Sequence, residues 1–156
     1  MKSKVYLETS VISYLTALPS RYLVQAAHQQ ITREWWERRG RFDLFVSQAV
    51  LREAAQGNAE VAARRLTALE GVPVLAIDAE VSELVGKFLQ MNVVPAKAEV
   101  DAVHIAVAVL NGMDYLVTWN CTHIANARIR GRIEQMCRVL ELPPPIICTP
   151  EELMEE

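Results

Sequence analysis

The chain has 156 residues, of which 51% are hydrophobic and 22% are charged, and its formal net charge is −3 at pH 7. That length suits one compact domain, which buries about two-thirds of the surface that the unfolded chain exposes. The net negative charge argues against binding of nucleic acid over the whole surface, because such binding requires clustered Lys and Arg. No apolar run approaches the roughly 18 residues of a membrane-spanning helix, so the sequence predicts a protein with no membrane partner.

The first predicted element is a short apolar strand over residues 5–7. It runs into Thr9 and Ser10, which are good N-cap residues for a helix over residues 11–18. Residues 1–4 provide no apolar signal core before this strand. We therefore expect a cytoplasmic protein whose single domain spans residues 1–156.

Residues 21–39 predict a long amphipathic helix whose apolar residues lie mostly on one side. These residues are Tyr22, Leu23, Ala26, Ala27, Ile31, Trp35 and Trp36. The two tryptophans are expected in the core or at an interface, and the exposed parts of the helix around them form a candidate homodimer surface. His28, on the same helix, has no evident partner.

The strand-then-helix pattern recurs along the rest of the chain. A strand over residues 44–46 leads into a helix over residues 48–56, which Ser47 can cap. The remaining predicted elements are a helix over 60–69, a strand over 74–77, helices over 79–91 and 98–110, a strand over 115–117, a helix over 124–140 and a strand over 146–148. This alternation predicts an α/β fold with a central, mostly parallel sheet covered by helices on both faces.

The helix predicted over residues 98–110 is apolar on every side after its first turns, so it should be largely buried. Its polar side chains, Glu99, Asp101 and His104, all lie in its N-terminal half. A buried charge needs an ion pair, hydrogen bonds or a metal, which favours Asp101 over Glu99 as a functional residue, although either could interact with the helix dipole. His104 is placed for metal ligation or proton transfer, and a hydrogen-bonded structural role is favoured for it and for His123.

Three further polar residues are expected near the carboxyl ends of the strands, where α/β sheets bind ligands. Glu8 and Asn120 follow predicted strands, and Glu53 lies in the helix after the second strand. Each has an ordinary alternative: an exposed loop carboxylate for Glu8, a solvent-facing charge for Glu53 and a helix N-cap for Asn120. Together with Asp101 they form an oxygen-rich set suited to Mg²⁺ or Mn²⁺.

The segments that carry these residues read VYLETS at 5–10, SQAVLRE at 47–53, EVDAVHIA at 99–106 and YLVTWN at 115–120. In this order they resemble the PIN-domain family, which includes the VapC-type toxins of bacterial and archaeal toxin–antitoxin pairs. The resemblance implies a three-layer α/β/α fold and a metal-dependent endoribonuclease. It also implies an RNA substrate, an antitoxin partner and Mg²⁺ or Mn²⁺ as cofactor.

Four residues fall at the acidic positions of the family: Glu8, Glu53, Asp101 and Asn120. The resemblance implies that all four are catalytic and bind the metal, with Asn120 orienting a water molecule. The family usually has Asp at the first and fourth positions, so Glu8 and Asn120 depart from its pattern. The competing hypothesis is a PIN-like module that binds RNA or protein without cutting. A phosphate-processing enzyme of another class ranks last, because the chain has no DxD motif or Gly-rich phosphate loop.

Basic side chains for the RNA backbone are expected from Arg128, Arg130 and Arg132, and Trp119 could stack on a base. The three cysteines, Cys121, Cys137 and Cys148, form neither a CxxC pair nor a zinc-type pattern. They are expected to be free thiols in a reducing compartment.

Overall fold

A computed structural model describes residues 1–154 of the chain. Within these residues five strands form one parallel sheet in the order β3-β2-β1-β4-β5. The strands are β1 (Ser3–Leu7), β2 (Phe42–Ser47), β3 (Val74–Leu75), β4 (Tyr115–Val117) and β5 (Ile146–Cys148). All five strand predictions are confirmed, and the bounds of β4 and β5 agree with the predicted ones to the residue.

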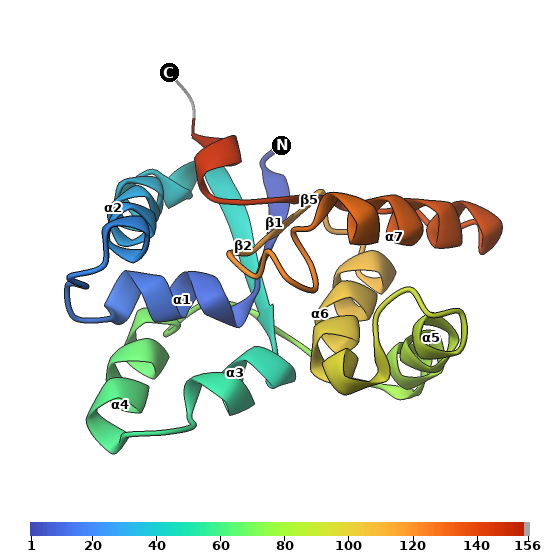
Figure 1. Cartoon of the computed structure of the whole chain (residues 1–156), viewed down its shortest axis with the longest axis horizontal. Helices are drawn as coiled ribbons and strands as arrows, with labels where there is room; N and C mark the ends of the chain where they lie inside the picture. Colours follow the sequence, from blue (N-terminus) through green and yellow to red (C-terminus); the bar gives the residue numbers. More distant parts are fainter. Residues whose placement is uncertain (155–156) are drawn as a thin grey trace.

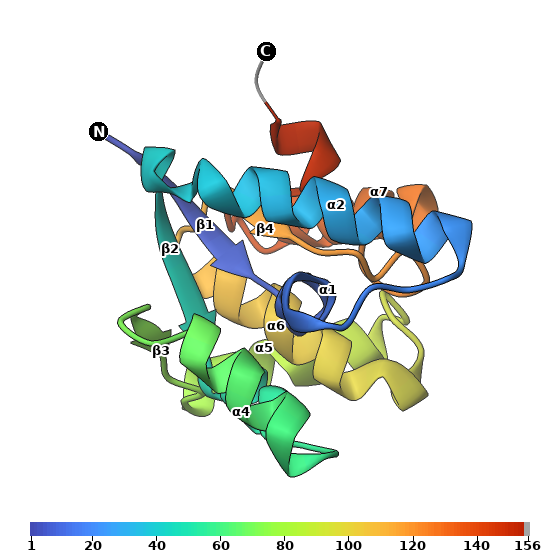
Figure 2. The ribbon, with the colours of Figure 1, turned by 90° about the vertical axis from the view of Figure 1, so that its left-hand side faces the viewer.

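Helices cover both faces of this sheet. They are α1 (Thr9–Thr16), α2 (Leu23–Glu37), α3 (Gln48–Ala54), α4 (Ala59–Ala68), α5 (Ala79–Gln90), α6 (Glu99–Leu110) and α7 (Ala127–Val139). Figure 1 shows α1, α2 and α4 on one side of the sheet and α5, α6 and α7 on the other. The turned view of Figure 2 agrees, with α1, α2 and α4 in front. The three-layer α/β/α fold expected from the resemblance is confirmed.

The core is densest around the central strand and one helix. Val5, Tyr6 and Leu7 of β1 are completely buried, and seven of the twelve residues of α6 are buried. A helix that is apolar on every side removes its side chains from water only when it lies inside the protein. The burial predicted for α6 is therefore confirmed.

The strand order reverses between β1 and β4. From β1 the chain proceeds outward to β2 and β3, and it then crosses to the other side of β1 to form β4 and β5. In sheets of this kind the connections after the two strands leave in opposite directions and open a crevice at their carboxyl ends. The Glu8 amide donates to the Val117 carbonyl at 3.1 Å, which places Glu8 in this crevice.

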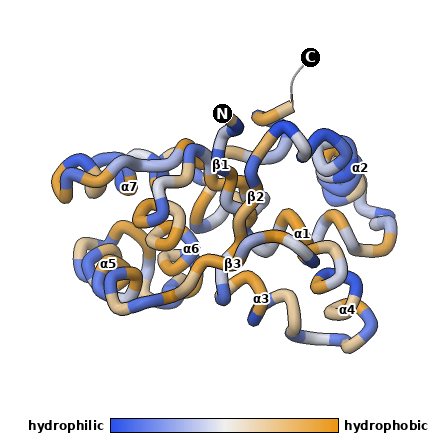
Figure 3. The backbone as a smooth tube through the Cα atoms, turned by 180° about the vertical axis from the view of Figure 1, so that it is seen from behind, coloured by the Kyte–Doolittle hydropathy of each residue, from blue (hydrophilic) through white to orange (hydrophobic). Residues whose placement is uncertain are grey.

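The predicted apolar side of α2 packs on the protein only in its C-terminal part, where Ile31, Trp35 and Trp36 contact the core. Its buried residues are Gln29, Thr32 and Trp35, whereas Tyr22 and Leu23 are 64% and 85% exposed. The polar residues are buried because they bind the loop and the core: Gln29 donates to the Leu18 carbonyl at 3.0 Å and accepts from the Ser20 amide at 2.9 Å. Figure 3 shows the largely hydrophilic character of α2.

Trp35 cannot contribute to the predicted homodimer surface. Its side chain is completely buried, and its ring stacks on Phe42 with centroids 5.9 Å apart. Trp36 is only partly buried and lies under the Arg39 guanidinium, 4.5 Å from the ring centroid. The prediction that these tryptophans are core or interface residues is confirmed for Trp35 as a core residue.

The starts of α1 and α7 also differ from prediction, by two and three residues, and both differences come from capping. α1 begins at Thr9 because the Glu8 side chain, rather than Thr9 or Ser10, accepts the Ser10 amide. α7 begins at Ala127 because Asn126 caps it. In the part of the chain that the structure describes, no helix has both the length and the apolar character needed to cross a bilayer.

Candidate metal centre

Glu8 is a buried carboxylate with only neutral donors. Its side chain caps α1, and Oε1 accepts from the Ser10 amide at 3.2 Å, from the Ser10 hydroxyl and from Thr118 Oγ1 at 2.6 Å. Glu8 is 5% exposed, and within residues 1–154 it forms no ion pair. Burying an unpaired carboxylate costs several kcal/mol, so this position favours a bound cation.

Glu53 projects from the short helix α3 toward Glu8. Its Oε1 accepts from Thr9 Oγ1 and from His104 Nε2, both at 2.6 Å. Burial alone would raise the pKa of the Glu53 carboxyl, but the hydrogen bonds from His104 and Thr9 outweigh burial and lower the pKa. Glu53 is therefore ionised at neutral pH.

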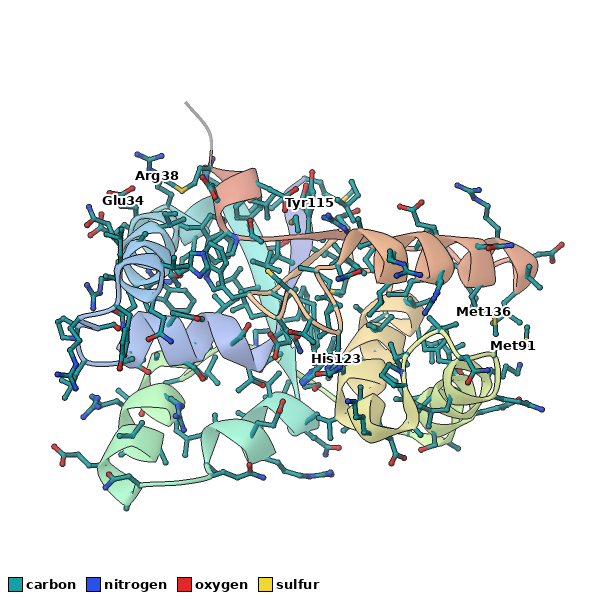
Figure 4. All side chains as sticks on the ribbon, viewed as in Figure 1. Glu34, Arg38, Met91, Tyr115, His123 and Met136 are labelled. Atoms are coloured by element: carbon teal, nitrogen blue, oxygen red, sulfur yellow. The ribbon has the colours of Figure 1, made fainter. Side chains whose placement is uncertain are left out.

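Asp101 and Asn120 contact each other directly. Asn120 accepts the His123 amide through Oδ1 at 3.0 Å, and its Nδ2 donates to Asp101 Oδ1 at 3.0 Å. Because a backbone N–H must face the amide oxygen, the amide nitrogen of Asn120 faces Asp101. His123 Nδ1 lies 3.2 Å from Asp101 Oδ2, and Figure 4 shows His123 beside α6.

Asp101 has the opposite electrostatic balance to Glu53. Burial and the negative charge of Glu8 raise the pKa of the Asp101 carboxyl, and the nearby His104 and His123 offset this only in part. The ionised form of Asp101 is therefore disfavoured in the metal-free site, and a bound cation would favour it.

The fold brings all four predicted residues to one place. Glu8, Glu53 and His104 each offer a ligand atom, and these atoms lie within 4.8 Å of one another. Asp101 is close enough to Glu8 and Glu53 for their charges to raise its pKa. The backbone N–H of Asn120 donates at 2.9 Å to Thr118 Oγ1, and the Thr118 hydroxyl in turn donates to Glu8.

The donor set suits a hard divalent cation. Three carboxylates supply oxygen atoms, the ligands that Mg²⁺ and Mn²⁺ prefer. The hydrogen bonds to Glu8 and Glu53 all end on Oε1 of each carboxylate. The second oxygen of each carboxylate takes no part in these bonds. The hydrogen bonds to Oε1 therefore hold Glu8 and Glu53 in place and leave Oε2 available to a cation.

Several residues around the site could not be found from local spacing. The Thr118 hydroxyl donates to Glu8. The Tyr6 hydroxyl is hydrogen-bonded to His104 and to Ser47. The only available signal was that Tyr6 places a polar group on a strand predicted to be buried. His104 is confirmed as a buried, hydrogen-bonded histidine.

Trp119 and His28 form an aromatic contact that the sequence did not reveal. Their rings stack with centroids 4.0 Å apart, and the Trp119 indole donates to Thr32 Oγ1 at 2.7 Å. Trp119 is 8% exposed, so the expected stacking on a base is not supported. The sequence shows no evident partner for His28 because Trp119, on which it stacks, lies 91 positions later in the chain.

The three arginines expected to contact RNA differ in their surroundings. Arg130 donates to the Ile147 carbonyl at 3.2 Å and lies 3.8 Å from Glu152. Arg128 and Arg132 are exposed. Asn126 accepts the Arg128 amide and donates to the carbonyl of Cys121, the residue after Asn120, so Arg128 lies near the loop that carries Asn120.

Comparison with known structures identifies the fold. The structure of Mycobacterium tuberculosis VapC20, described as a sarcin-ricin loop cleaving toxin, has 18% sequence identity and a TM-score of 0.60; the match covers 76% of this chain and 91% of that chain. VapBC2 from Rickettsia felis, bound to a DNA fragment from their promoter, has 15% identity and a TM-score of 0.59, with 94% and 98% covered. No curated protein matches the sequence. A model of the PIN domain matches residues 5–120, which contain all four predicted site residues, and the chain therefore belongs to the PIN-domain family.

Proposed function

We propose that this protein is a metal-dependent endoribonuclease whose metal, Mg²⁺ or Mn²⁺, is held by Glu8, Glu53 and Asp101. The observation that carries the proposal is the buried Glu8 carboxylate, which has neutral donors only. It offers a ligand atom within 4.8 Å of one from Glu53, and its charge is close enough to Asp101 to raise the pKa of that carboxyl. Three negative charges in one crevice repel one another unless a cation neutralises them. When bound, such a cation supplies the positive charge that phosphodiester hydrolysis requires.

The remaining residues of the site prepare the carboxylates for this task. Asn120 holds Asp101 through its amide nitrogen, and Ser10 and Thr118 hold Glu8. Asn120 is therefore assigned to positioning Asp101 and to orienting water beside it. An amide at this position removes one negative charge, so we expect weaker metal binding than four carboxylates would give.

The toxin role and the RNA substrate are further parts of the proposal. They are supported by the structural likeness to VapC20, described as a sarcin-ricin loop cleaving toxin, and to VapBC2 bound to promoter DNA. We propose a structured RNA as substrate, a small antitoxin encoded beside the gene as partner, and the cytoplasm as the location.

Cleavage of structured RNA in the presence of Mg²⁺ or Mn²⁺ tests the catalytic proposal. Asp101→Asn should abolish cleavage, whereas Glu99→Gln should leave it unchanged, because Glu99 is exposed on the same helix two residues away. Equal cleavage by Asp101→Asn would point to a contaminating nuclease. RNA binding without any cleavage by the unaltered protein would instead support a non-cutting PIN module.

The toxin role has a separate test. The neighbouring small reading frame should encode a protein that copurifies with this chain and inhibits its cleavage of RNA. If no such reading frame exists, the nuclease proposal remains but the toxin role is refuted.

A further inference from the structure

Behind Glu53 lies a chain of buried hydrogen bonds that the proposed reaction does not by itself require. Ser47 Oγ lies 2.7 Å from the Tyr6 hydroxyl, which lies 2.6 Å from His104 Nδ1. His104 Nε2 then lies 2.6 Å from Glu53 Oε1. Tyr6, Ser47 and His104 are all completely buried, so no water competes for these contacts.

The partners determine where the protons lie. Tyr6 is completely buried, and a phenol without contact to water or to a base stronger than imidazole keeps its hydrogen. An ionised Glu53 can only accept, so His104 Nε2 must carry the hydrogen of that contact. With a neutral imidazole, Nδ1 then accepts from Tyr6, and Ser47, which accepts the Ala49 amide at 3.2 Å, can donate to the Tyr6 oxygen. In this arrangement each hydrogen bond between Ser47, Tyr6, His104 and Glu53 has one donor and one acceptor.

We propose that His104 is a positioning residue that fixes the Glu53 carboxylate through Nε2–H, and that Tyr6 fixes the tautomer of His104. This inference rests on the proposed function, because it assigns Glu53 to the metal. A nitrogen that donates its hydrogen to Glu53 cannot bind a cation at the same time. His104 therefore acts behind the metal ligand, although its Nε2 is close enough to Glu8 and Glu53 to be taken for one.

Glu53 depends on such support because of its location. It projects from a seven-residue helix, and its side chain is 33% exposed. Its hydrogen bonds come from Thr9 and from His104, which lies on α6, 51 positions later in the chain. Removal of a residue that hydrogen-bonds a metal ligand in this way typically lowers the metal affinity by about 10–100-fold.

Calorimetric titration of the metal-free protein with Mn²⁺ at constant pH tests the inference. His104→Leu should raise the Kd for Mn²⁺ by about 10–100-fold. His104→Gln retains an N–H donor and should recover part of the affinity. Tyr6→Phe, which keeps the ring and removes only the hydroxyl, should weaken binding less than His104→Leu. Thermal melts in EDTA establish that each variant is folded.

A purely structural role would give a different result. It predicts folded variants with a lower Tm but an unchanged Kd for Mn²⁺, and that result would overturn the inference. If the unaltered protein binds neither Mg²⁺ nor Mn²⁺, the proposed function itself fails, and the tautomer can still be examined in the metal-free protein.

Nitrogen-15 NMR of the histidine rings provides this independent readout. In the metal-free protein His104 should carry its hydrogen on Nε2, and Tyr6→Phe should mix the two tautomers. Addition of Mg²⁺ should leave the Nε2 hydrogen in place. Loss of that hydrogen on addition of Mg²⁺ would identify His104 as a ligand and refute the positioning role.

Discussion

Two carboxylates of the same site have pKa values that move in opposite directions, and the cause lies in their immediate neighbours. Glu53 receives hydrogen bonds from His104 and Thr9, which lower its pKa despite burial. Asp101 is buried and close to the charge of Glu8, which raises its pKa. The cost of assembling the site without a metal therefore falls mainly on Asp101 and on the unpaired Glu8.

Asp101→Asn should raise the stability of the metal-free protein at neutral pH. A carboxyl whose pKa is raised by folding binds its proton more tightly in the folded state. Its ionised form therefore lowers stability at neutral pH, and this effect disappears as the pH falls through the raised pKa of Asp101. Thermal melts in EDTA should give the variant a higher Tm than the unaltered protein at pH 7, with the difference shrinking toward acid pH.

Addition of Mn²⁺ should reverse that order. A ligand at about 100 times its Kd stabilises the folded state by about 2.7 kcal/mol, and the variant should lose most of this gain. Glu99→Gln is the matched control and should respond to Mn²⁺ as the unaltered protein does. A lower Tm for Asp101→Asn in EDTA at pH 7 would show that the contacts of Asp101 with Asn120 and His123 outweigh the repulsion.

The three free cysteines should react at very different rates. Burial raises the pKa of the Cys137 thiol, and it raises that of Cys148 to about 12, whereas Cys121 is exposed. Because the thiolate is the reactive form, iodoacetamide at pH 8 should label Cys121 in the folded protein and the other two only after denaturation in urea. Peptide mass spectrometry measures this, and equal labelling of Cys148 in the folded state would contradict the structure.

At the scale of the elements, the sequence predicted best where its pattern allowed a single arrangement. The apolar helix α6 could only be buried, and the short apolar run of β4 could only be a strand. The apolar side of α2 was predicted correctly only in its C-terminal part, because periodicity identifies an apolar side without showing what covers it. Gln29 and Thr32 are buried there through contacts with Leu18 and Trp119.

The same reasoning explains how much of the site could be predicted. Glu8 and Asn120 follow strands that the predicted topology brings to one edge, so their proximity follows from the order of the elements. Tyr6 and His104 are 98 positions apart in the chain, and their contact depends on how two buried side chains pack. No spacing rule in a single sequence carries that information.

Thr32→Val tests how firmly α2 is anchored to the loop that carries the site. Thr32 Oγ1 accepts the Trp119 indole N–H at 2.7 Å, and valine keeps the shape while removing the acceptor. A buried donor without a partner costs about 1–3 kcal/mol, and urea denaturation should detect a loss of this size. Thr67→Val is the matched control: Thr67 is exposed on α4, and its substitution should change stability by less than about 0.5 kcal/mol. Equal effects of the two substitutions would refute the anchoring role.

At the scale of the whole molecule, the family match and the folded unit do not end at the same place. The match ends at residue 120, whereas β5 and α7 follow it. β5 pairs with β4, and the Thr118 amide donates to the Cys148 carbonyl at 3.0 Å. Thr118 also holds Glu8, so the segment after residue 120 supports the site although it supplies none of the predicted ligands.

A chain truncated after residue 120 should therefore fail to fold cooperatively. Truncation removes four buried side chains of α7, those of Ile129, Ile133, Met136 and Cys137, and exposes β4 as an edge. Burying a large aliphatic side chain contributes about 1.5–3 kcal/mol, so the three largest of these together are comparable with the whole stability of a typical domain, about 5–15 kcal/mol. Circular dichroism should give a sigmoidal melt for the full chain and a broad, featureless one for the truncated chain. A sigmoidal melt of the truncated chain would mean that residues 1–120 form an independent unit, and the proposal of one domain over residues 1–156 would then be wrong.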